Sequence, residues 1–188
     1  MEKYVNHPKC IAIGECGLDY FRLPEDEVEK AQNIKKQKEV FIAQIEFAKK
    51  VKKPLIVHIR EASNDSRQIL VDYNAKEVGG VLHCYNASEH LLILAEHNFY
   101  FGIGGVLTFK NAKKLVEVLP KIPKDKLLIE TDAPYLTPHP HRGERNEPYY
   151  TVFVAQKMAE LLQINEDEIQ KLTTNNAKKL FKEFSSLS

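Results

Sequence analysis

Four polar residues stand where short apolar segments of the sequence end: Glu15, His58, His83 and Asp132. Two neutral imidazoles and two carboxylates form a ligand set for Zn, Mn, Fe or Mg that needs no thiolate. Such a set suits metal-assisted hydrolysis, in which a divalent ion lowers the pKa of bound water and a carboxylate accepts the proton. Any one of these residues alone is better read as a strand end, a core histidine or a turn, so the hypothesis depends on all of them together.

The elements that must position these residues are short apolar runs bounded by Gly, Pro or charge. They predict strands over residues 11–14, 55–59, 78–84, 99–107 and 126–131. Near-continuous apolar strands separated by helices are typical of a parallel sheet, and successive strand ends lie about one βα unit apart. Because ligands bind at the C-terminal ends of parallel strands, we expect the polar residues to converge on one point.

Alternation along the strands predicts which neighbours share a face with the candidate ligands. It places Arg60 beside His58, Tyr85 beside His83, and Glu130 beside Asp132. The long irregular stretch that follows, PYLTPHPHRGERNEP, is of a length that is often functional in a compact domain.

Helical patterns lie between and after the predicted strands. Phe41 and Ile45 belong to one apolar stripe, and residues 91–95 predict a second, short helix. Asn165 followed by Glu168 is a capping-box pattern that predicts the start of a C-terminal helix. The chain therefore reads as an α/β protein that ends in helices.

Composition and charge narrow the class of protein. The 188 residues are 43% hydrophobic and carry a net charge of +1, which predicts one domain over residues 1–188 and leaves any nucleic-acid contact to a local patch. No run approaches a membrane span, and the N-terminus lacks a signal pattern. Cys10, Cys16 and Cys84 are odd in number and never spaced C-x-x-C, so we expect small core residues in a reduced, cytoplasmic protein.

The motifs, taken in order, resemble those of the TatD-type metal-dependent deoxyribonucleases, which belong to the amidohydrolase-like (β/α)8 TIM-barrel group. The matching blocks are AIGECGLDYF, PLIVHIREA, GGVLHCY, FGIGGVLTF, LLIETDAPYLTP, RGERNEP and TTNNAKKLF. Several long motifs in the right order are more specific than one short pattern. The resemblance spans essentially the whole chain and implies a hydrolase that cleaves phosphodiester bonds in DNA.

The resemblance also implies a set of site residues. The complete family site holds two divalent cations, and Mg, Mn or Zn would suit it. Glu15 is similar to the bridging carboxylate, His58 and His83 to ligands of one ion, and Asp132 to a ligand of the other that also handles the nucleophilic water. Asp132 and Glu15 are thus the implied catalytic residues. The substrate side would be lined by Arg60, Tyr85, Arg142 and Asn146, although a loop held by its own turns explains the last two equally well.

The front of the chain departs from the family pattern. The resemblance calls for a first strand with a His-x-His pair and two more βα units, and nothing before Cys10 supplies them. A (β/α)8 barrel takes about 250 residues. We therefore expect an incomplete barrel of about five parallel strands, one bound ion in place of two, and weak or no hydrolysis by this chain alone.

The unpaired strand edges of an incomplete barrel would favour self-association, and three explanations of the short front stay open. Met1 is an internal methionine of a longer protein, two chains complete each other, or the chain is a degraded or miscalled product. The first and third are favoured, because the missing ligands and the missing barrel wall disappear together.

Two other functions also stay open at this stage. A related metal-dependent hydrolase could act on a C–N or ester bond, since metal ligands alone do not distinguish these substrates. Alternatively, the chain is a non-catalytic fragment or interaction module that uses its exposed sheet edge for a partner.

Overall fold

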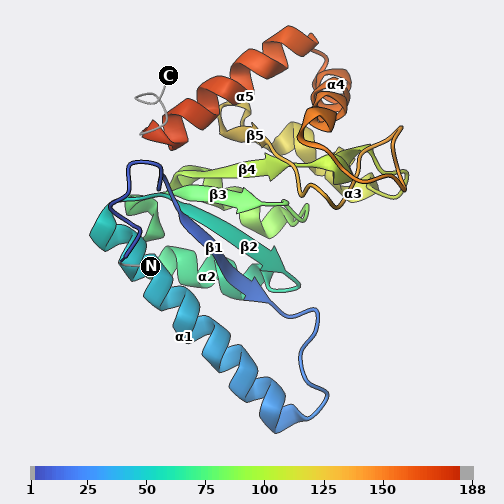
Figure 1. Cartoon of the computed structure of the whole chain (residues 1–188). Coiled ribbons are helices and arrows are strands. Elements are labelled where there is room, and N and C mark those ends of the chain that lie inside the picture. Colours follow the sequence, from blue (N-terminus) through green and yellow to red (C-terminus); the bar gives the residue numbers. More distant parts are fainter. Residues whose placement is uncertain (1–2, 183–188) are drawn as a thin grey trace.

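A single parallel sheet organises the computed structural model, which describes residues 3–182 (Figure 1). Its strands are β1 (Ile13–Asp19), β2 (Leu55–Arg60), β3 (Gly80–His83), β4 (Phe99–Ile103) and β5 (Leu127–Ile129). Strand order in the sheet follows the order of the sequence, and each strand runs parallel to the next. The predicted parallel α/β sheet of five strands is confirmed, with β1 and β5 at its edges.

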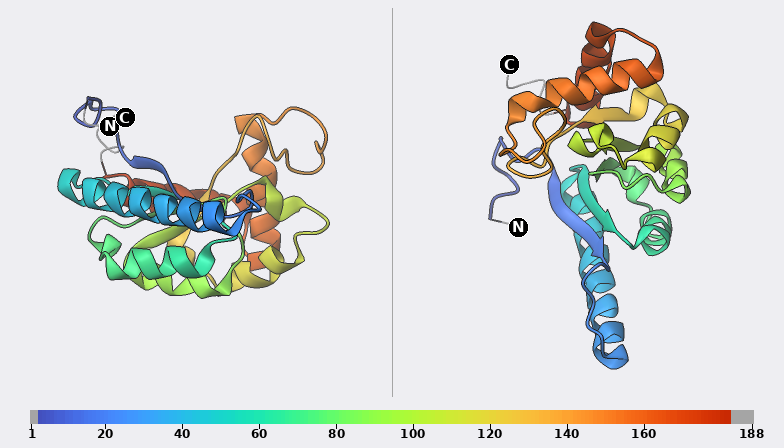
Figure 2. Two further views of the ribbon diagram at one scale, coloured as in Figure 1. Left: turned by 90° about the horizontal axis from the view of Figure 1, so that it is seen from below. Right: turned by 90° about the vertical axis from the view of Figure 1, so that its right-hand side faces the viewer.

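Helices connect and follow the strands. They are α1 (Glu27–Val51), α2 (Ser63–Asp72), α3 (Lys113–Val118), α4 (Thr151–Leu162) and α5 (Glu166–Leu180). Helices α1 and α2 lie on one side of the sheet, whereas α4 and α5 lie beside β5 (Figure 1). The first half of α1 extends beyond the sheet (Figure 2). Within residues 3–182, no helix is long and apolar enough to cross a membrane.

Short 3₁₀ helices complete the connections. They cover Ala75–Glu77, Glu89–His97, Gly105–Thr108, Leu119–Lys121, Lys124–Lys126 and Pro148–Tyr150. The helix expected at residues 91–95 is therefore present as a 3₁₀ helix. The strand expected over residues 99–107 ends early, at Ile103, because the chain turns into the 3₁₀ helix that follows.

The main hydrophobic core lies between the sheet and its helices. Phe41 and Ile45 of α1 are fully buried and belong to one cluster with Val57 of β2 and Phe101 of β4. The predicted apolar stripe of α1 is thus confirmed. The opposite face of the sheet carries a second, smaller cluster, which packs against the end of α5: Val81, Tyr100, Leu128 and Leu180.

Strand β1 extends further than its sequence suggested. The apolar run was expected to stop at Glu15, but the strand continues to Asp19. Cys16 and Leu18 are buried within it, whereas Glu15, which directly precedes Cys16, is exposed. Alternating burial therefore keeps the chain extended past the first polar residue, and Glu15 lies inside the strand near a register irregularity between Ile13 and Cys16.

A side chain of α1 binds the outer edge of β1. The Gln37 Oε1 atom accepts the backbone N–H of Asp19 at 2.8 Å, and the Gln37 Nε2 atom donates to the Asp19 carbonyl at 2.8 Å. On the inner side, the backbone N–H of Tyr20 donates to the Arg60 carbonyl of β2. The end of β1 is therefore held from both sides.

The start of α5 matches its sequence pattern. The Asn165 side chain accepts a hydrogen bond from the backbone N–H of Glu168 at 2.8 Å, which confirms the predicted cap. The helix then buries Ile169 and Leu180. Asn176 of the same helix donates to the carbonyls of Lys124 and Leu127, so α5 is fastened to the start of β5.

Candidate functional site

Two histidines lie next to each other at the C-terminal ends of β2 and β3. His58 and His83 are direct partners in the parallel register of these strands, so both imidazoles stand on the same face of the sheet. Glu15 stands on the neighbouring strand β1, and Asp132 follows β5 on a loop that lies beside the ends of β3 and β4 (Figure 1). The structure thus brings the four predicted ligands to the same side of the sheet, where the C-terminal ends of its strands lie.

Carboxylates flank the imidazole of His58 on both sides. Its Nδ1 atom lies 3.0 Å from Glu15 Oε1, and its Nε2 atom lies 3.2 Å from Asp19 Oδ2. The side chains are 36% exposed for His58, 49% for Glu15 and 43% for Asp19, so water screens the electrostatic part of these contacts strongly. The group is therefore open to solvent and free to exchange partners.

The imidazole of His83 is flanked in the same way but is less exposed. Its Nδ1 atom lies 3.1 Å from Glu130 Oε2, and its Nε2 atom lies 2.9 Å from Asp132 Oδ1. The pKa of His83 is raised to about 10, mainly by its hydrogen bond to Asp132 and next by its hydrogen bond to Glu130, although burial acts in the opposite direction. The hydrogen bond from His83 also lowers the pKa of Asp132. In this arrangement the imidazole is positively charged and Asp132 is ionised at neutral pH.

The four predicted ligands form two pairs and not one group. Glu15 contacts His58, and Asp132 contacts His83. Within residues 3–182, no three His, Cys, Asp or Glu side chains are grouped so that they could hold a metal ion. The expected convergence on one point is therefore not seen, because each imidazole is held by carboxylates on both of its nitrogens. The donor types nevertheless fit a divalent ion, since two imidazoles and two carboxylates stand on neighbouring strands.

Two carboxylates of this region were not among the predicted site residues. Asp19 lies four positions after Glu15 on β1, and Glu130 lies two positions before Asp132 in the segment that follows β5, an even spacing that places residues on one side of an extended chain. The even spacing from a predicted ligand was therefore a sequence signal that each carboxylate belongs to the site. Their contacts with the histidines of other strands are long-range and could not be read from spacing.

Close approach of β1 to β2 at the site depends on a glycine. Gly17 pairs with His58 in register and has a φ of +140°, which side chains rarely allow. A Cβ atom at this position would lie 2.0 Å from the His58 carbonyl oxygen. Gly17 therefore permits the strand spacing at which the Glu15 and His58 side chains meet.

The two arginines predicted to face substrate both stack on aromatic rings. The Arg60 guanidinium lies 3.5 Å from the centre of the Phe21 ring, and that of Arg142 lies 4.0 Å from the centre of the Phe109 ring. The Arg142 Nη1 atom also donates to the carbonyl of Thr137 at 3.1 Å. Stacking fixes the plane of each guanidinium and leaves edge N–H groups for other acceptors.

Tyr85 does not share the face of His83, contrary to the prediction from alternation. Between them, Cys84 has a φ of +45°, which ends the strand and turns the chain. The Tyr85 ring packs edge-on against Phe101 in the main core at 4.9 Å, and its hydroxyl donates to the Ser88 carbonyl. Tyr85 therefore packs in the main core.

Asn146 closes the loop that carries Asp132. Its Nδ2 atom donates to the Tyr135 carbonyl and to Thr131 Oγ1, and its backbone N–H donates to the Pro134 carbonyl. The side chain is almost fully buried, at 3% exposure. These contacts hold the two ends of the loop together.

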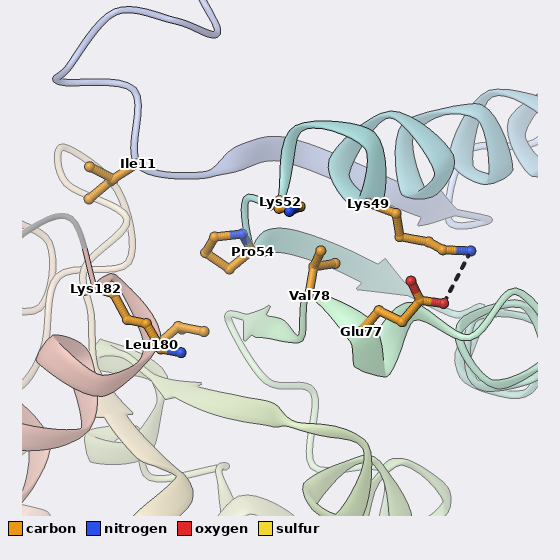
Figure 3. A pocket seen from close by; sticks show the side chains of 8 residues that line it. All are labelled: Ile11, Lys49, Lys52, Pro54, Glu77, Val78, Leu180 and Lys182. Carbon is orange, nitrogen blue, oxygen red and sulfur yellow. Dashed lines mark ion pairs between the residues drawn. The ribbon is translucent and has the colours of Figure 1, made fainter.

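Cavities lie at both ends of the sheet. An open cavity of about 400 Å³ borders the His58 pairs and is lined by Glu15, Cys16, Gly17, Asp19, Gln37, Gln44 and His58. A larger cavity of about 490 Å³ lies at the opposite, N-terminal ends of the strands (Figure 3). It contains lysines and the Lys49–Glu77 ion pair but none of the predicted ligands, so its size does not mark it as the reactive site.

Of the three cysteines expected in the core, Cys16 is buried, whereas Cys10 and Cys84 are half-buried. All three are free thiols. Burial raises the pKa of Cys16 to about 12 and also raises the pKa of Cys84 well above its usual range. Both thiols are therefore protonated at neutral pH and poor nucleophiles.

Known proteins with related sequences share most of this chain. The Bacillus subtilis protein named uncharacterized metal-dependent hydrolase YabD is 49% identical over 179 residues, which cover 94% of this chain and 67% of the relative. The Escherichia coli K12 protein of the same description, YcfH, is 40% identical over 172 residues, which cover 91% of this chain and 62% of the relative. The chain thus spans about two thirds of the length of the curated relatives it matches.

Solved structures show the same architecture. The crystal structure of YjjV, a TatD homologue from Escherichia coli K12, matches with a TM-score of 0.84 and 27% identity, covering 96% of this chain and 68% of that one. A TatD family hydrolase from Entamoeba histolytica matches in fold with a TM-score of 0.74 and 24% identity, covering 96% of this chain and 65% of that one. These neighbours are of the TIM-barrel type. The family model described as TatD related DNase matches residues 1–182, so this chain belongs to the TatD family of metal-dependent hydrolases.

Proposed function

We propose that this chain is a metal-dependent hydrolase that cleaves phosphodiester bonds in DNA. The observation that carries the proposal is the pair of register-matched histidines, each in contact with carboxylates, at the C-terminal ends of parallel strands. The family model, whose description names a DNase, supports the choice of DNA among possible substrates.

The proposed ligands are Glu15, His58, His83 and Asp132, and a divalent cation such as Mg, Mn or Zn is the proposed cofactor. Glu15 would bridge two ions in the complete family site, and His58 and His83 would bind one of them. When bound, the ion supplies charge to stabilise the phosphodiester oxygens and lowers the pKa of water. Loading requires His83 to lose its extra proton, which the ion displaces.

Asp132 is the proposed general base. The contact with His83 keeps it ionised at neutral pH but lowers its pKa, so it would accept a proton more readily once metal binding removes the extra proton of His83. Glu15 stands on the other side of the paired histidines, on β1, and is the second proposed catalytic carboxylate. The two carboxylates thus flank the position where a phosphodiester would be attacked.

Arg60 and Arg142 are the proposed substrate-side groups. Each guanidinium is held in plane by an aromatic ring, which lowers the entropy lost when it binds a phosphate oxygen. Tyr85 and Asn146 would act through buried contacts that hold the loops around the substrate.

Zinc titration by calorimetry, run beside cleavage of a labelled DNA oligonucleotide, tests the proposal. We expect about one Zn²⁺ per chain and weak, metal-dependent cleavage, both lost in His58→Ala and His83→Ala. His97→Ala is the matched control, because His97 lies in the 3₁₀ helix before β4, away from the site. Equal zinc binding by all of these proteins would refute the ligand assignment.

The same protein samples, tested on amide and ester substrates, separate DNA cleavage from the related hydrolase chemistry. Zinc-dependent cleavage of only those substrates would replace the phosphodiester proposal. A stable, folded chain that binds no zinc would favour the interaction module, which the pairwise arrangement of the ligands in the structure also allows.

A further inference from the structure

The Glu130 carboxylate makes two directed contacts at the end of β3. Its Oε1 atom accepts the backbone N–H of Cys84 at 2.5 Å, and its Oε2 atom lies 3.1 Å from His83 Nδ1. The Glu130 side chain is only 17% exposed. One oxygen is therefore fixed by the backbone, and this fixes the other oxygen against the imidazole.

The sheet leaves room for this carboxylate at a glycine of the neighbouring strand. A Cβ atom on Gly102 of β4 would lie 2.0 Å from Glu130 Oε2 and 2.6 Å from its Cδ atom. At Gly104, two positions later, a Cβ atom would come no closer than 3.7 Å to any Glu130 atom, which is ordinary contact. Of these two glycines, only Gly102 is thus required to leave room for the Glu130 carboxylate.

We propose that Glu130 is a positioning residue that orients the His83 imidazole for metal binding. It accepts a hydrogen bond from Nδ1–H and so leaves the electron pair of Nε2, which faces Asp132, for the ion. A ligating histidine commonly donates its other N–H to such a carboxylate, which fixes the tautomer and the ring orientation. This inference rests on the proposed function, because it assigns His83 as a ligand.

The Glu130→Gln variant separates this role from simple packing. The Cys84 N–H is a fixed donor and keeps the carboxamide oxygen, so the NH₂ group must face His83 Nδ1. An NH₂ group there favours the opposite tautomer, with the proton on Nε2. The shape of the side chain and its backbone contact survive, while the polarity at the imidazole is reversed.

The Gly102→Ala variant tests the same role without changing Glu130. The new methyl group occupies the seat of the carboxylate and forces it away from His83. Gly104→Ala is the matched control, and Glu117→Gln, an exposed position in α3, controls for the loss of a charge. Both controls should behave as the wild type.

Zinc affinity by calorimetry and the His83 ring ¹⁵N signals by NMR are the measurements, with thermal unfolding as a check on the fold. We expect Glu130→Gln and Gly102→Ala to bind zinc roughly 10–100-fold more weakly than the wild type. In the zinc-loaded wild type, the His83 signals should show a protonated Nδ1, and Glu130→Gln should lose that signature. A purely structural role would lower the melting temperature and leave the tautomer unchanged.

The outcomes separate this inference from the proposed function. If His83→Ala binds zinc as the wild type does, the ligand assignment fails and the inference fails with it. If His83→Ala loses zinc while Glu130→Gln and Gly102→Ala keep wild-type affinity and the same tautomer, only the role of Glu130 is overturned. Should Glu130→Gln not fold, the comparison of Gly102→Ala with Gly104→Ala decides.

Discussion

Replacing Gly17 by alanine should damage both the fold and the candidate site. The residue has a φ of +140° and lies against β2, where an added Cβ would stand 2.0 Å from the backbone oxygen of His58. A backbone oxygen in a sheet cannot swing aside as a side chain can. Strand β1 must therefore move away from β2 or the methyl group must be accommodated by strain.

The magnitude follows from these two causes. A side chain in a backbone conformation that favours glycine costs about 1–3 kcal/mol, and forcing an extra methyl group into a packed site costs a similar amount. We expect Gly17→Ala to lower the free energy of unfolding by about 2–6 kcal/mol, out of the roughly 5–15 kcal/mol typical of a domain. Because Glu15 and Asp19 lie on the same strand, both should also withdraw from His58.

Urea unfolding followed by circular dichroism measures the first effect, and zinc titration at low temperature, where the variant is still folded, measures the second. Gly104→Ala is the control, since its Cβ atom meets only ordinary contacts. A Gly17→Ala protein within about 0.5 kcal/mol of the wild type, with unchanged zinc affinity, would refute the reasoning about strand spacing.

Three further predictions concern the reacting groups. In a protein that carries the complete family site, Asp132→Asn should slow single-turnover DNA cleavage by roughly 10²–10⁴-fold with a much smaller change in DNA affinity, and normal cleavage would remove the proposed base. Arg142→Ala should weaken DNA binding at every sequence and reduce the slope of log affinity against log salt concentration by about one, as measured by binding isotherms at several salt concentrations. An unchanged slope would mean that Arg142 serves only its structural contacts with Phe109 and Thr137. In EDTA, the free energy of unfolding should fall as the pH rises from 6.5 towards 10, because the pKa of His83 is raised on folding to about 10. Urea denaturation at several pH values measures this fall, which should be smaller for His83→Gln. A free energy of unfolding that increases with pH over this range would contradict the assignment.

Most of the fold could be predicted from the sequence because the signals that specify it are local. Apolar runs with helices between them predicted the parallel sheet, and the stripe containing Phe41 and Ile45 predicted the buried face of α1. Asn165 and Glu168 predicted the start of α5. The exact ends of strands were less predictable, since the continuation of β1 past Glu15 depends on burial of Cys16 and Leu18 in a core that later elements of the chain complete.

The site could be predicted only in part, for a related physical reason. The placement of His58 and His83 at strand ends is local, and their pairing in register follows from the parallel order of β2 and β3. Contacts of Glu130 with another strand, and of Arg142 with Phe109, join residues that spacing does not connect. The position of Tyr85 was missed because one left-handed residue, Cys84, interrupts the alternation.

The Gln37 amide on β1 bears on how this molecule meets other chains. An edge strand offers N–H and C=O groups to any passing extended segment, and this is how sheets grow into aggregates. At Asp19 both groups are already bound by an amide that has the same donor and acceptor as a peptide unit. A strand that paired with β1 here would first have to displace the Gln37 amide. Because helix α1 holds this amide next to β1, its local concentration does not fall on dilution. The Gln37 side chain thus blocks strand addition at the end of the free edge that lies next to the proposed site.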